Sequence, residues 1–527
     1  MPCAKGVLRS FAVCCGGGDR TKDEPPTVYD SIRKVLTLGG SRQSFSRSSL
    51  LLHYNPDRSF VKHYQKGAKL GQGGFGAVFR CTHRASNDMR ALKVIKKTDV
   101  QKDMEYVYTE IEAMLRLDHP NIVKMHDLFE ERHDILVVVE LCTGGDFGKL
   151  HRDQCPMETV RPLFRDIVLG MAYCHDLQIV HRDIKFENCL LADGRKRKIG
   201  KVIDFGLSAI KRKFEVDAEG SPKRSDEGWL SEALGTKYFA APEVIDKGAK
   251  YGIKCDVWSL GVMLYIMFTT EHPYAKDATS LSTVELFARI LTSPYREEPV
   301  RRGRVPVHAA TLMKGMLDKD SVARISAVDA LGNPWLKPLT FRELDMHTAI
   351  SQESSRSLAG RLDSWSRTSH FEKVVLTLVA HQAKLKEVED MRSAFVALDM
   401  DGNGSLSRQE LERGLKNMGQ AMSTAHFDQM YKWLDSNENS KLDYTEWLCA
   451  TMEPAIISAE SSMRELFEFF DMDDNGYVSH KELEHVTSAE EAHEFLAQSD
   501  TSKDGRLDYE EFKVLMRSIS KSRSGSG

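Results

Sequence analysis

The order of six short motifs between residues 71 and 261 constrains the fold of this chain more than any other feature. A glycine-rich segment, GQGGFGAV, is followed by RALKVI, and then HRDIKFENCL, DFG, APE and DVWSLG come in that order. One such motif is weak evidence, because glycines and aspartates are common in ordinary loops. The complete series is strong evidence, because it is the combination and its order that are specific.

The glycine-rich segment alone also fits a dinucleotide-binding fold. That fold requires a helix directly after the glycines and an acidic residue about 20 positions further on. Here the strand-like run AVFRCTH follows, and the next distinctive residue is Lys93. Glycines in such a loop lack β-carbons, so backbone amides can approach phosphate groups. The segment therefore predicts a phosphate-binding loop that leads into a strand.

Taken together, the motifs resemble those of eukaryotic protein kinases over roughly residues 64–336, which implies a two-lobed α/β fold. The resemblance implies that Lys93 holds the phosphates of ATP, that Asn188 and Asp204 hold Mg²⁺, and that Asp183 accepts the hydroxyl proton of the substrate. The implied catalytic residues are Asp183, Lys185, Asn188, Lys93, Glu110 and Asp204. The implied ATP-binding residues are Leu70, Gly71, Gly73, Gly74, Phe75, Gly76, Val78, Ala91, Lys93, Val139, Glu140 and Cys142.

The same resemblance carries expectations about substrates. The K-x-E-N form of the catalytic loop and Thr236 in GTKYFAAPE accompany serine/threonine specificity. Asp146 and Glu187 match acidic positions that receive a basic residue N-terminal to the target serine, although the family usually has glutamate where Asp146 stands. Val139 matches the gatekeeper position before the hinge. We therefore expect protein substrates with basic residues before the phosphorylated serine or threonine.

The segment between DFG and APE contains an additional charged stretch, KRKFEVDAEGSPKRSDEGW. Ser221 and Ser225 are candidate phosphorylation sites, because a phosphate there could order the loop against Arg182. The alternative is an unregulated surface insertion, since mixtures of serine, proline and charge are ordinary loop composition.

Four acidic loops follow, starting at Asp399, Asp435, Asp471 and Asp500. DMDGNGSLSRQE and DMDDNGYVSHKE, the first and third, match the EF-hand pattern D-x-[DN]-x-[DN]-G-x₅-E in full. Such a loop offers Ca²⁺ the oxygens of positions 1, 3, 5, 7 and 12. The predicted calcium ligands are Asp399, Asp401, Asn403, Ser405 and Glu410; Asp435, Asn437, Asn439, Lys441 and Glu446; Asp471, Asp473, Asn475, Tyr477 and Glu482; and Asp500, Ser502, Asp504, Arg506 and Glu511.

The four loops are not equivalent. The last loop has Ser502 at position 3, and we still expect it to bind calcium. The second loop has Ser440 where the turn needs glycine, so it is the weakest predicted calcium site. The third and fourth loops start at residues 471 and 500, a shorter spacing than the others, so short helices must separate them.

The alternative for a single loop is an acidic solvated turn. Against it, each loop has an apolar residue at position 8 that can pair with the equivalent residue of a neighbouring loop. These residues are Leu406, Leu442, Val478 and Leu507.

A kinase, a junction and four EF-hands in this order resemble the calcium-dependent protein kinases of plants and protists. The expected fold is multidomain, with an α/β kinase followed by an all-α calmodulin-like region. We expect a disordered extension over 1–60, a kinase domain over 64–336, a regulatory junction over 337–387, and EF-hand pairs over 388–452 and 453–520. The resemblance implies that Ca²⁺ relieves inhibition by the junction.

The junction contains the segment FEKVVLTLVAHQAKLKEV, which begins at Phe371. Its apolar residues Phe371, Val374, Val375, Leu378 and Val379 have helical spacing, and Gln382 interrupts the stripe. Calcium opens sensor EF-hands and exposes an apolar groove, so this helix is a candidate intramolecular ligand of the EF-hand region. The alternative is a helix that caps the EF-hand core with and without calcium.

Two other functions remain as alternatives at this point. One is a calcium-binding scaffold whose kinase domain serves only for docking, although Lys93, Asp183 and Asp204 are all present. The other is an active kinase whose EF-hands only hold structure.

Composition excludes some classes of protein and leaves a membrane question open. With 73 basic and 77 acidic residues, the net charge is −4, so we expect no nucleic-acid partner. The longest apolar run, WSLGVMLYIMFTT, is too short to span a bilayer. Pro2 stands where N-myristoylation needs glycine, but Cys3, Cys14 and Cys15 could be palmitoylated. We expect a cytoplasmic protein that associates with membranes only if these cysteines are acylated.

Overall fold

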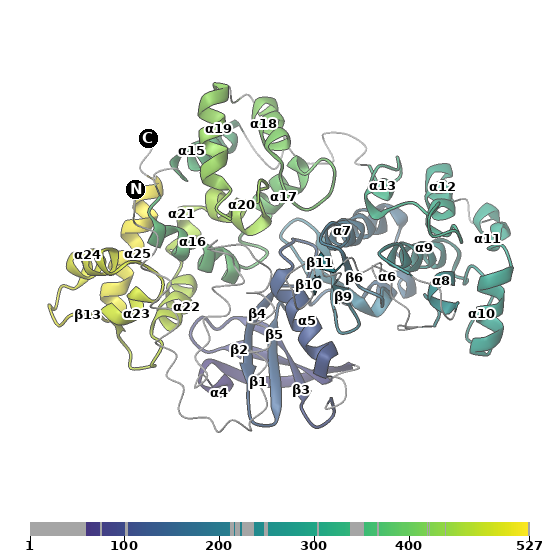
Figure 1. Cartoon of the computed structure of the whole chain (residues 1–527), viewed down its shortest axis with the longest axis horizontal. Coiled ribbons are helices and arrows are strands. Elements are labelled where there is room, and N and C mark those ends of the chain that lie inside the picture. Colours follow the sequence, from purple (N-terminus) through teal and green to yellow (C-terminus); the bar gives the residue numbers. More distant parts are fainter. Residues whose placement is uncertain are drawn as a thin grey trace.

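The computed structural model describes residues 59–73, 76–100, 104–210, 215–216, 222–223, 237–246, 251–302, 305–337, 352–365, 368–418, 420, 422–437 and 439–524. Most of the N-terminal extension lies outside the described residues, and so do Gly74, Phe75, Ser221, Ser225 and Thr236. Figure 1 shows a two-lobed α/β region with a mainly helical region beside it, as the sequence predicts.

The small lobe is built on an antiparallel sheet with strand order β1-β2-β3-β5-β4. Its elements are α4 (Phe60–His63), β1 (Tyr64–Gly73), β2 (Gly76–His83), β3 (Met89–Lys96), α5 (Met104–Arg116), β4 (Met125–Glu130) and β5 (Asp134–Val139). The AVFRCTH run forms most of β2, directly after the glycine turn. This lobe therefore has the strand arrangement that the glycine-rich segment predicts.

The large lobe is mainly helical and carries the catalytic segments between its two longest helices. Its helices are α6 (Phe147–Arg152), α7 (Met157–Asp176), α8 (Pro242–Ile245), α9 (Lys254–Thr269), α10 (Thr283–Thr292), α11 (Glu297–Arg302), α12 (Val307–Met316) and α13 (Ala327–Leu331), with the 3-10 turn η1 (Phe186–Asn188). Its short strands are β6 (Ile179–Val180), β7 (Cys189–Asp193), β8 (Lys198–Val202), β9 (Ala209–Ile210), β10 (Glu215–Val216) and β11 (Pro222–Lys223).

The apolar run that begins at Trp258 lies in α9 and is a core helix, because the residues from Cys255 to Tyr265 are all buried. Within the described part of the chain, no helix has the length and apolar character needed to cross a bilayer.

The EF-hands form two pairs, as their spacing predicts. Pair one contains α17 (Glu389–Leu398), α18 (Arg408–Asn417), α19 (Thr424–Leu434) and α20 (Tyr444–Thr451). After α21 (Pro454–Ile457), pair two contains α22 (Glu460–Phe470), β12 (Val478–Ser479), α23 (His480–Glu484), α24 (Ala489–Ser499), β13 (Arg506–Leu507) and α25 (Tyr509–Ser524). Leu406 pairs with Leu442, and Val478 pairs with Leu507, which confirms the predicted coupling of loops. The short spacing of loops three and four results from the brief helix α23.

The junction forms α15 (Gln352–Ser364) and α16 (His370–Gln382). A capping box of Ser369 with Glu372 starts α16. The predicted stripe from Phe371 to Val379 is buried against α20, α21 and α22, so α16 lies between the two EF-hand pairs (Figure 1). Its C-terminal end reaches the small lobe, where Lys124 donates to the carbonyl of Ala380 at 3.1 Å.

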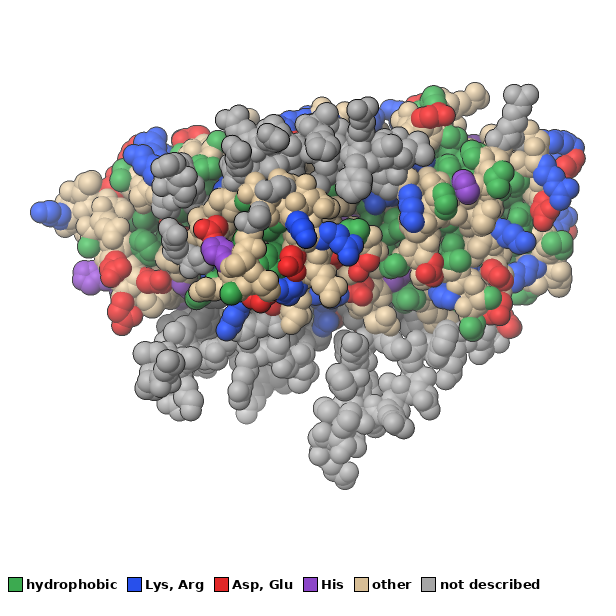
Figure 2. Space-filling view, turned by 90° about the horizontal axis from the view of Figure 1, so that it is seen from above, with side chains coloured by type: hydrophobic (Ala, Val, Ile, Leu, Met, Phe, Trp, Pro, Cys, Tyr) green, Lys and Arg blue, Asp and Glu red, His purple; other side chains and the backbone are tan. Residues whose placement is uncertain are grey.

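The face shown in Figure 2 carries basic and acidic side chains of both signs among apolar ones. That mixture agrees with the small net charge of the sequence.

Candidate active site and calcium sites

The centre of the candidate active site is the ion pair between Lys93 of β3 and Glu110 of α5. Lys93 Nζ lies 2.5 Å from Glu110 Oε1 and 3.3 Å from Asp204 Oδ1. Burial opposes the charge of Lys93, but the two carboxylates outweigh it and hold the pKa of its ammonium group above the ordinary value. These contacts keep a cation at the interface of the two lobes, where phosphates of a nucleotide would need one.

The catalytic loop is fixed by hydrogen bonds to α9. The carboxylate of Asp256, buried in the first turn of α9, accepts from the backbone N–H groups of His181 at 2.9 Å and Arg182 at 2.8 Å. Arg182 has a φ of +68° and Asp204 a φ of +63°, in the left-handed region that non-glycine residues seldom adopt. Strained backbone of this kind persists only where its surroundings hold it.

The loop presents Asp183 next to two polar side chains. Lys185 Nζ lies 2.6 Å from Asp183 Oδ2. The side-chain amide of Asn188 donates to the backbone carbonyl of Asp183 at 2.8 Å and to its carboxylate at 3.0 Å. The carbonyl oxygen of the Asn188 amide remains as an acceptor or metal ligand. A carboxylate held by a lysine and an amide can position a hydroxyl group and take its proton.

Several of the predicted ATP-binding residues lie together where β3 meets β5. Ala91 pairs with Val139 across these strands, and Val78 lies on the neighbouring strand β2. A β-carbon on Gly76 would lie 2.1 Å from the carbonyl oxygen of Val94, so only glycine fits there. These small and apolar side chains suit contact with a flat apolar base.

The side chains of Glu140 and Cys142, which follow β5, are held within the kinase domain. The carboxylate of Glu140 accepts from Lys201 at 2.7 Å, and its backbone N–H donates to the carbonyl of Lys124 at 2.8 Å. Burial raises the pKa of the Cys142 thiol, so this side chain is neutral at physiological pH.

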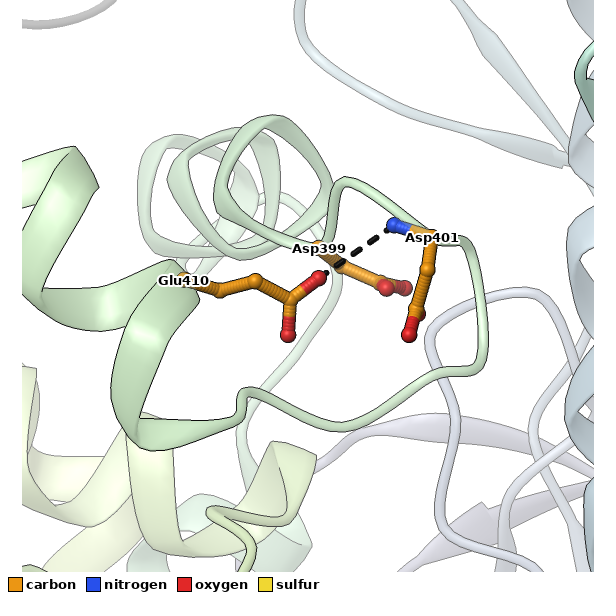
Figure 3. Close-up of side chains that lie close together, drawn as sticks. All are labelled: Asp399, Asp401 and Glu410. Atoms are coloured by element: carbon orange, nitrogen blue, oxygen red, sulfur yellow. Dashed lines mark hydrogen bonds between the residues drawn. The ribbon is translucent and has the colours of Figure 1, made fainter.

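The first calcium loop brings three carboxylates together. Ligand oxygens of Asp399, Asp401 and Glu410 all lie within 4.8 Å of one another, and Figure 3 shows them pointing into one loop. Burial, with the nearby acids, raises the pKa of Asp399 to about 8. Carboxylates gathered in this way repel one another, and a divalent cation relieves that repulsion. The donors therefore fit Ca²⁺.

The third and fourth loops offer the same chemistry in a more open setting. Asp471, Asp473 and Glu482 also gather within 4.8 Å, and burial raises the pKa of Asp471 to about 6. In the fourth loop, N–H groups of Gly505 and Lys503 outweigh the effect of burial and lower the pKa of Asp500.

The second loop adopts the same turn without its glycine. Ser440 has a φ of +64°, as the sequence predicts, and its N–H donates to Asp435 at 2.9 Å. Replacing Ser440 by glycine is expected to strengthen calcium binding at this site about fivefold, because left-handed backbone costs a non-glycine residue roughly 1 kcal/mol. Calorimetric titration of the full chain measures this change. Unaltered affinity would mean that the serine is not strained in the calcium-bound loop.

The two lobes, the ordered catalytic residues and the paired calcium loops define a protein kinase fused to EF-hands. The protein kinase domain model matches residues 64–336, the EF-hand domain pair model matches 388–452, and an EF hand model matches 463–487 and 494–516. Calcium-dependent protein kinases 17 and 34 of Arabidopsis thaliana are each 30% identical to this chain. The matches cover 86% and 88% of this chain and 83% and 86% of the relatives. Calcium-dependent protein kinase 19 of Oryza sativa is 29% identical over 86% of this chain and 82% of its own length.

The chain therefore belongs to the calcium-dependent protein kinase family. As a member it is a calcium-activated serine/threonine protein kinase, and it binds ATP and Ca²⁺.

Sequence reasoning missed the contacts between the EF-hand region and the kinase. Arg392 of α17 is buried and reaches Asp166 of α7 at 3.2 Å, and Asp166 also binds Arg197. Glu389 accepts from the backbone N–H groups of Arg195 and Lys196. The sequence offered two signals, the basic run RKRK that begins at Arg195 and the acidic pair Glu389 and Asp390. Neither signal identifies its partner.

These contacts hold the turn between β7 and β8. That hairpin begins directly after Asn188 and ends two residues before Asp204, so its open end carries both predicted magnesium ligands. The EF-hand region thereby touches an element that is continuous with the active site.

Replacing Arg392 by methionine is expected to lower the calcium-activated rate about tenfold. The substitution removes a hydrogen bond to a charged group, a contact of roughly 1.5–3 kcal/mol. Phosphate transfer in saturating calcium measures the effect, and Arg408→Met is the control, because this half-buried arginine of α18 forms its ion pairs within the EF-hand region. Equal rates for both variants would contradict the expectation.

The effect of Arg392 is expected to be the same at pH 6 and pH 8. Burial raises the pKa of Asp166, but Arg197 and Arg392 outweigh it and bring the pKa down to about 2. An ionised carboxylate with a depressed pKa stabilises the fold fully above its unfolded pKa near 4. This stabilisation is lost only as the pH falls through about 2, well below both pH values.

Proposed function

We propose that calcium activates this kinase by securing the junction helix α16 within the EF-hand region, which relieves inhibition of the kinase by the junction. One observation supports this most strongly. The apolar stripe of α16 is enclosed by the EF-hand helices while the contacts among Lys93, Glu110 and Asp204 are in place.

The position of the junction is consistent with relief of inhibition. The described junction residues that bond to the kinase include Ala380, His381, Gln382 and Lys384. Their partners are Lys124, the backbone of His126, Arg90 with the side chain of His126, and Asp88, which lies just before β3. The other kinase residues lie on β3, on β4 and just before β4, and none of these partners belongs to the predicted catalytic set. A helix held there leaves the catalytic residues accessible to substrate.

We propose that Mg²⁺ accompanies ATP and is held by Asn188 and Asp204. Their oxygens suit a hard cation that prefers carboxylates and amide carbonyls. When bound, this ion would neutralise negative charge on the phosphates.

We further propose a moderate preference for basic residues N-terminal to the target serine or threonine. Glu187 is exposed beside the catalytic loop and can pair with such a residue. The carboxylate of Asp146 is already used, because it caps α6 through Lys149 N–H at 2.8 Å and binds Arg152 at 3.2 Å. Glu187 is therefore expected to contribute more than Asp146.

For localisation, we propose a cytoplasmic enzyme that reaches membranes through palmitoylation of Cys3, Cys14 or Cys15. The support is the cluster of cysteines with Lys5 and Arg9 nearby in the sequence.

Phosphate transfer from ATP to a basic serine peptide, with and without free Ca²⁺, tests the proposed function. We expect transfer that rises steeply with calcium and falls when the basic residues of the peptide are replaced by alanine. Equal rates with and without calcium would leave the EF-hands with a structural role. No transfer in either condition would favour the calcium-binding scaffold.

A further inference from the structure

The first calcium loop differs from the third and fourth in what surrounds its turn. Gly402 and Gly404 of the first loop, which both have positive φ, are buried. Gly476 and Gly505, which occupy the position of Gly404 in the third and fourth loops, are exposed, and a β-carbon on either would meet no heavy atom within 4 Å. A calcium loop does not need such cover, so its presence on one loop calls for an explanation.

The kinase domain supplies the cover. A β-carbon on Gly404 would lie 2.5 Å from Tyr173 and 2.7 Å from His119. One on Gly402 would lie 2.5 Å from a methyl group of Leu331 and 3.3 Å from Leu169. Leu169 and Tyr173 belong to α7, and Leu331 ends α13. The large lobe thus presents an apolar seat against which only glycines can pack so closely.

Polar contacts around this seat hold the same face of pair one. The backbone N–H of Thr445, in the first turn of α20, donates to Asp118 at 2.8 Å. That amide has no partner within its own helix, because first-turn amides lack one. In the second loop, Lys441 pairs with Asp176 at the end of α7 at 2.9 Å.

The third EF-hand also touches the kinase, but its glycine turn is not packed against it. Its helix α22 carries Glu465, which forms a buried ion pair with Arg90 at 2.7 Å. The third loop itself contributes an ion pair about as exposed as that of Lys441. Lys62 pairs with Asp474 at 2.7 Å, and both side chains are partly exposed. Exposed ion pairs of this kind contribute little, since solvent screens them.

We propose that the first calcium loop is a docking element, which seats its glycine turn on the large lobe of the kinase and couples calcium binding at that loop to domain docking. This inference deepens the proposed switch and rests on it. Calcium fixes the conformation of an EF-hand loop, and a fixed turn packs against a rigid surface with less loss of entropy. Coupling of two binding events is reciprocal, so the docked kinase raises the calcium affinity of this loop as much as calcium strengthens docking.

The glycines provide a matched pair of variants for the full-length chain. Gly404→Ala and Gly476→Ala place alanine at the same loop position, with φ of +80° and +84°, so each strains its own loop equally. Only Gly404→Ala also collides with Tyr173 and His119. In saturating calcium, hydrogen exchange of the Thr445 amide, resolved by mass spectrometry, is expected to become about tenfold faster in Gly404→Ala and to remain at the wild-type rate in Gly476→Ala. Equal exchange in the two variants would overturn the proposal.

A kinase-side variant covers the case in which alanine disrupts the first loop itself. Leu331→Ala leaves every calcium ligand intact, and Val328→Ala is the control on the exposed side of α13. Calorimetry of the full chain with calcium alone is expected to show one site weakened about fivefold in Leu331→Ala, the lower end of typical coupling. Unchanged calcium affinity in Leu331→Ala would overturn the proposal.

The same samples separate this inference from the proposed switch. A wild-type chain whose phosphate transfer ignores calcium would refute the switch. The exchange contrast between Gly404→Ala and Gly476→Ala decides the docking role of the loop without reference to phosphate transfer.

Discussion

Replacing Asp183 by asparagine is expected to lower phosphate transfer about a thousandfold in saturating calcium. The carboxylate lies 2.6 Å from Lys185 and accepts a hydrogen bond from Asn188, so an amide of the same shape can occupy its place. What the amide cannot do is take a proton, and general-base catalysis contributes roughly a hundred- to ten-thousandfold. Initial rates with a serine peptide measure the loss.

The matched control for this variant is Asp153→Asn, an exposed aspartate at the end of α6. It removes the same charge from the same lobe and is expected to leave the rate unchanged. Calcium titrations of both variants are expected to superimpose on the wild type, because neither touches an EF-hand. A rate that survives in Asp183→Asn would show that another group accepts the proton.

The sequence predicted those parts of the molecule whose chemistry requires particular residues at fixed spacing. Lys93, Glu110 and Asp204 lie far apart in the chain, yet their motifs predicted the cluster that the structure contains. The positive φ of Ser440 followed from the position of the turn within its loop. In both cases a ligand, a phosphate or a cation, restricts which residues can be used.

Contacts between the domains had no such signal. Gln382 interrupts the apolar stripe of α16, and the sequence indicated no partner for it. In the structure its amide oxygen accepts from Arg90 at 2.9 Å and lies 3.2 Å from His126 Nδ1. A polar residue at the end of a buried helix is understood only once the neighbouring domain is placed.

The junction helix is also more deeply buried than its stripe predicts. Leu376, Ala380 and His381 are buried as well, although they lie outside the five predicted positions. The reason is that α16 is enclosed by both EF-hand pairs and meets the kinase at its C-terminal end. Periodicity describes a helix with one covered face, so it underestimates a helix covered on several faces.

Because α16 is enclosed in this way, substitutions in it are expected to have a large effect on calcium activation. Replacing both Val375 and Leu378 by glutamate is expected to abolish calcium activation. The two side chains are 0% and 4% exposed within the EF-hand core, and a carboxylate buried there without a partner costs several kcal/mol. Moving a kinase from about 1% to 99% active requires roughly 5.5 kcal/mol of differential binding. Two buried carboxylates are enough to cancel that difference.

The calcium ligands themselves are untouched by this double variant, so calcium still binds, with an affinity lowered only by the lost coupling to the helix. Phosphate transfer and calorimetry of the full chain, measured together, are expected to show activation lost and calcium binding retained. Lys386→Glu introduces the same side chain at an exposed position of the same segment and is expected to activate normally. Full activation of the double variant would instead mean that α16 caps the EF-hands without controlling the kinase.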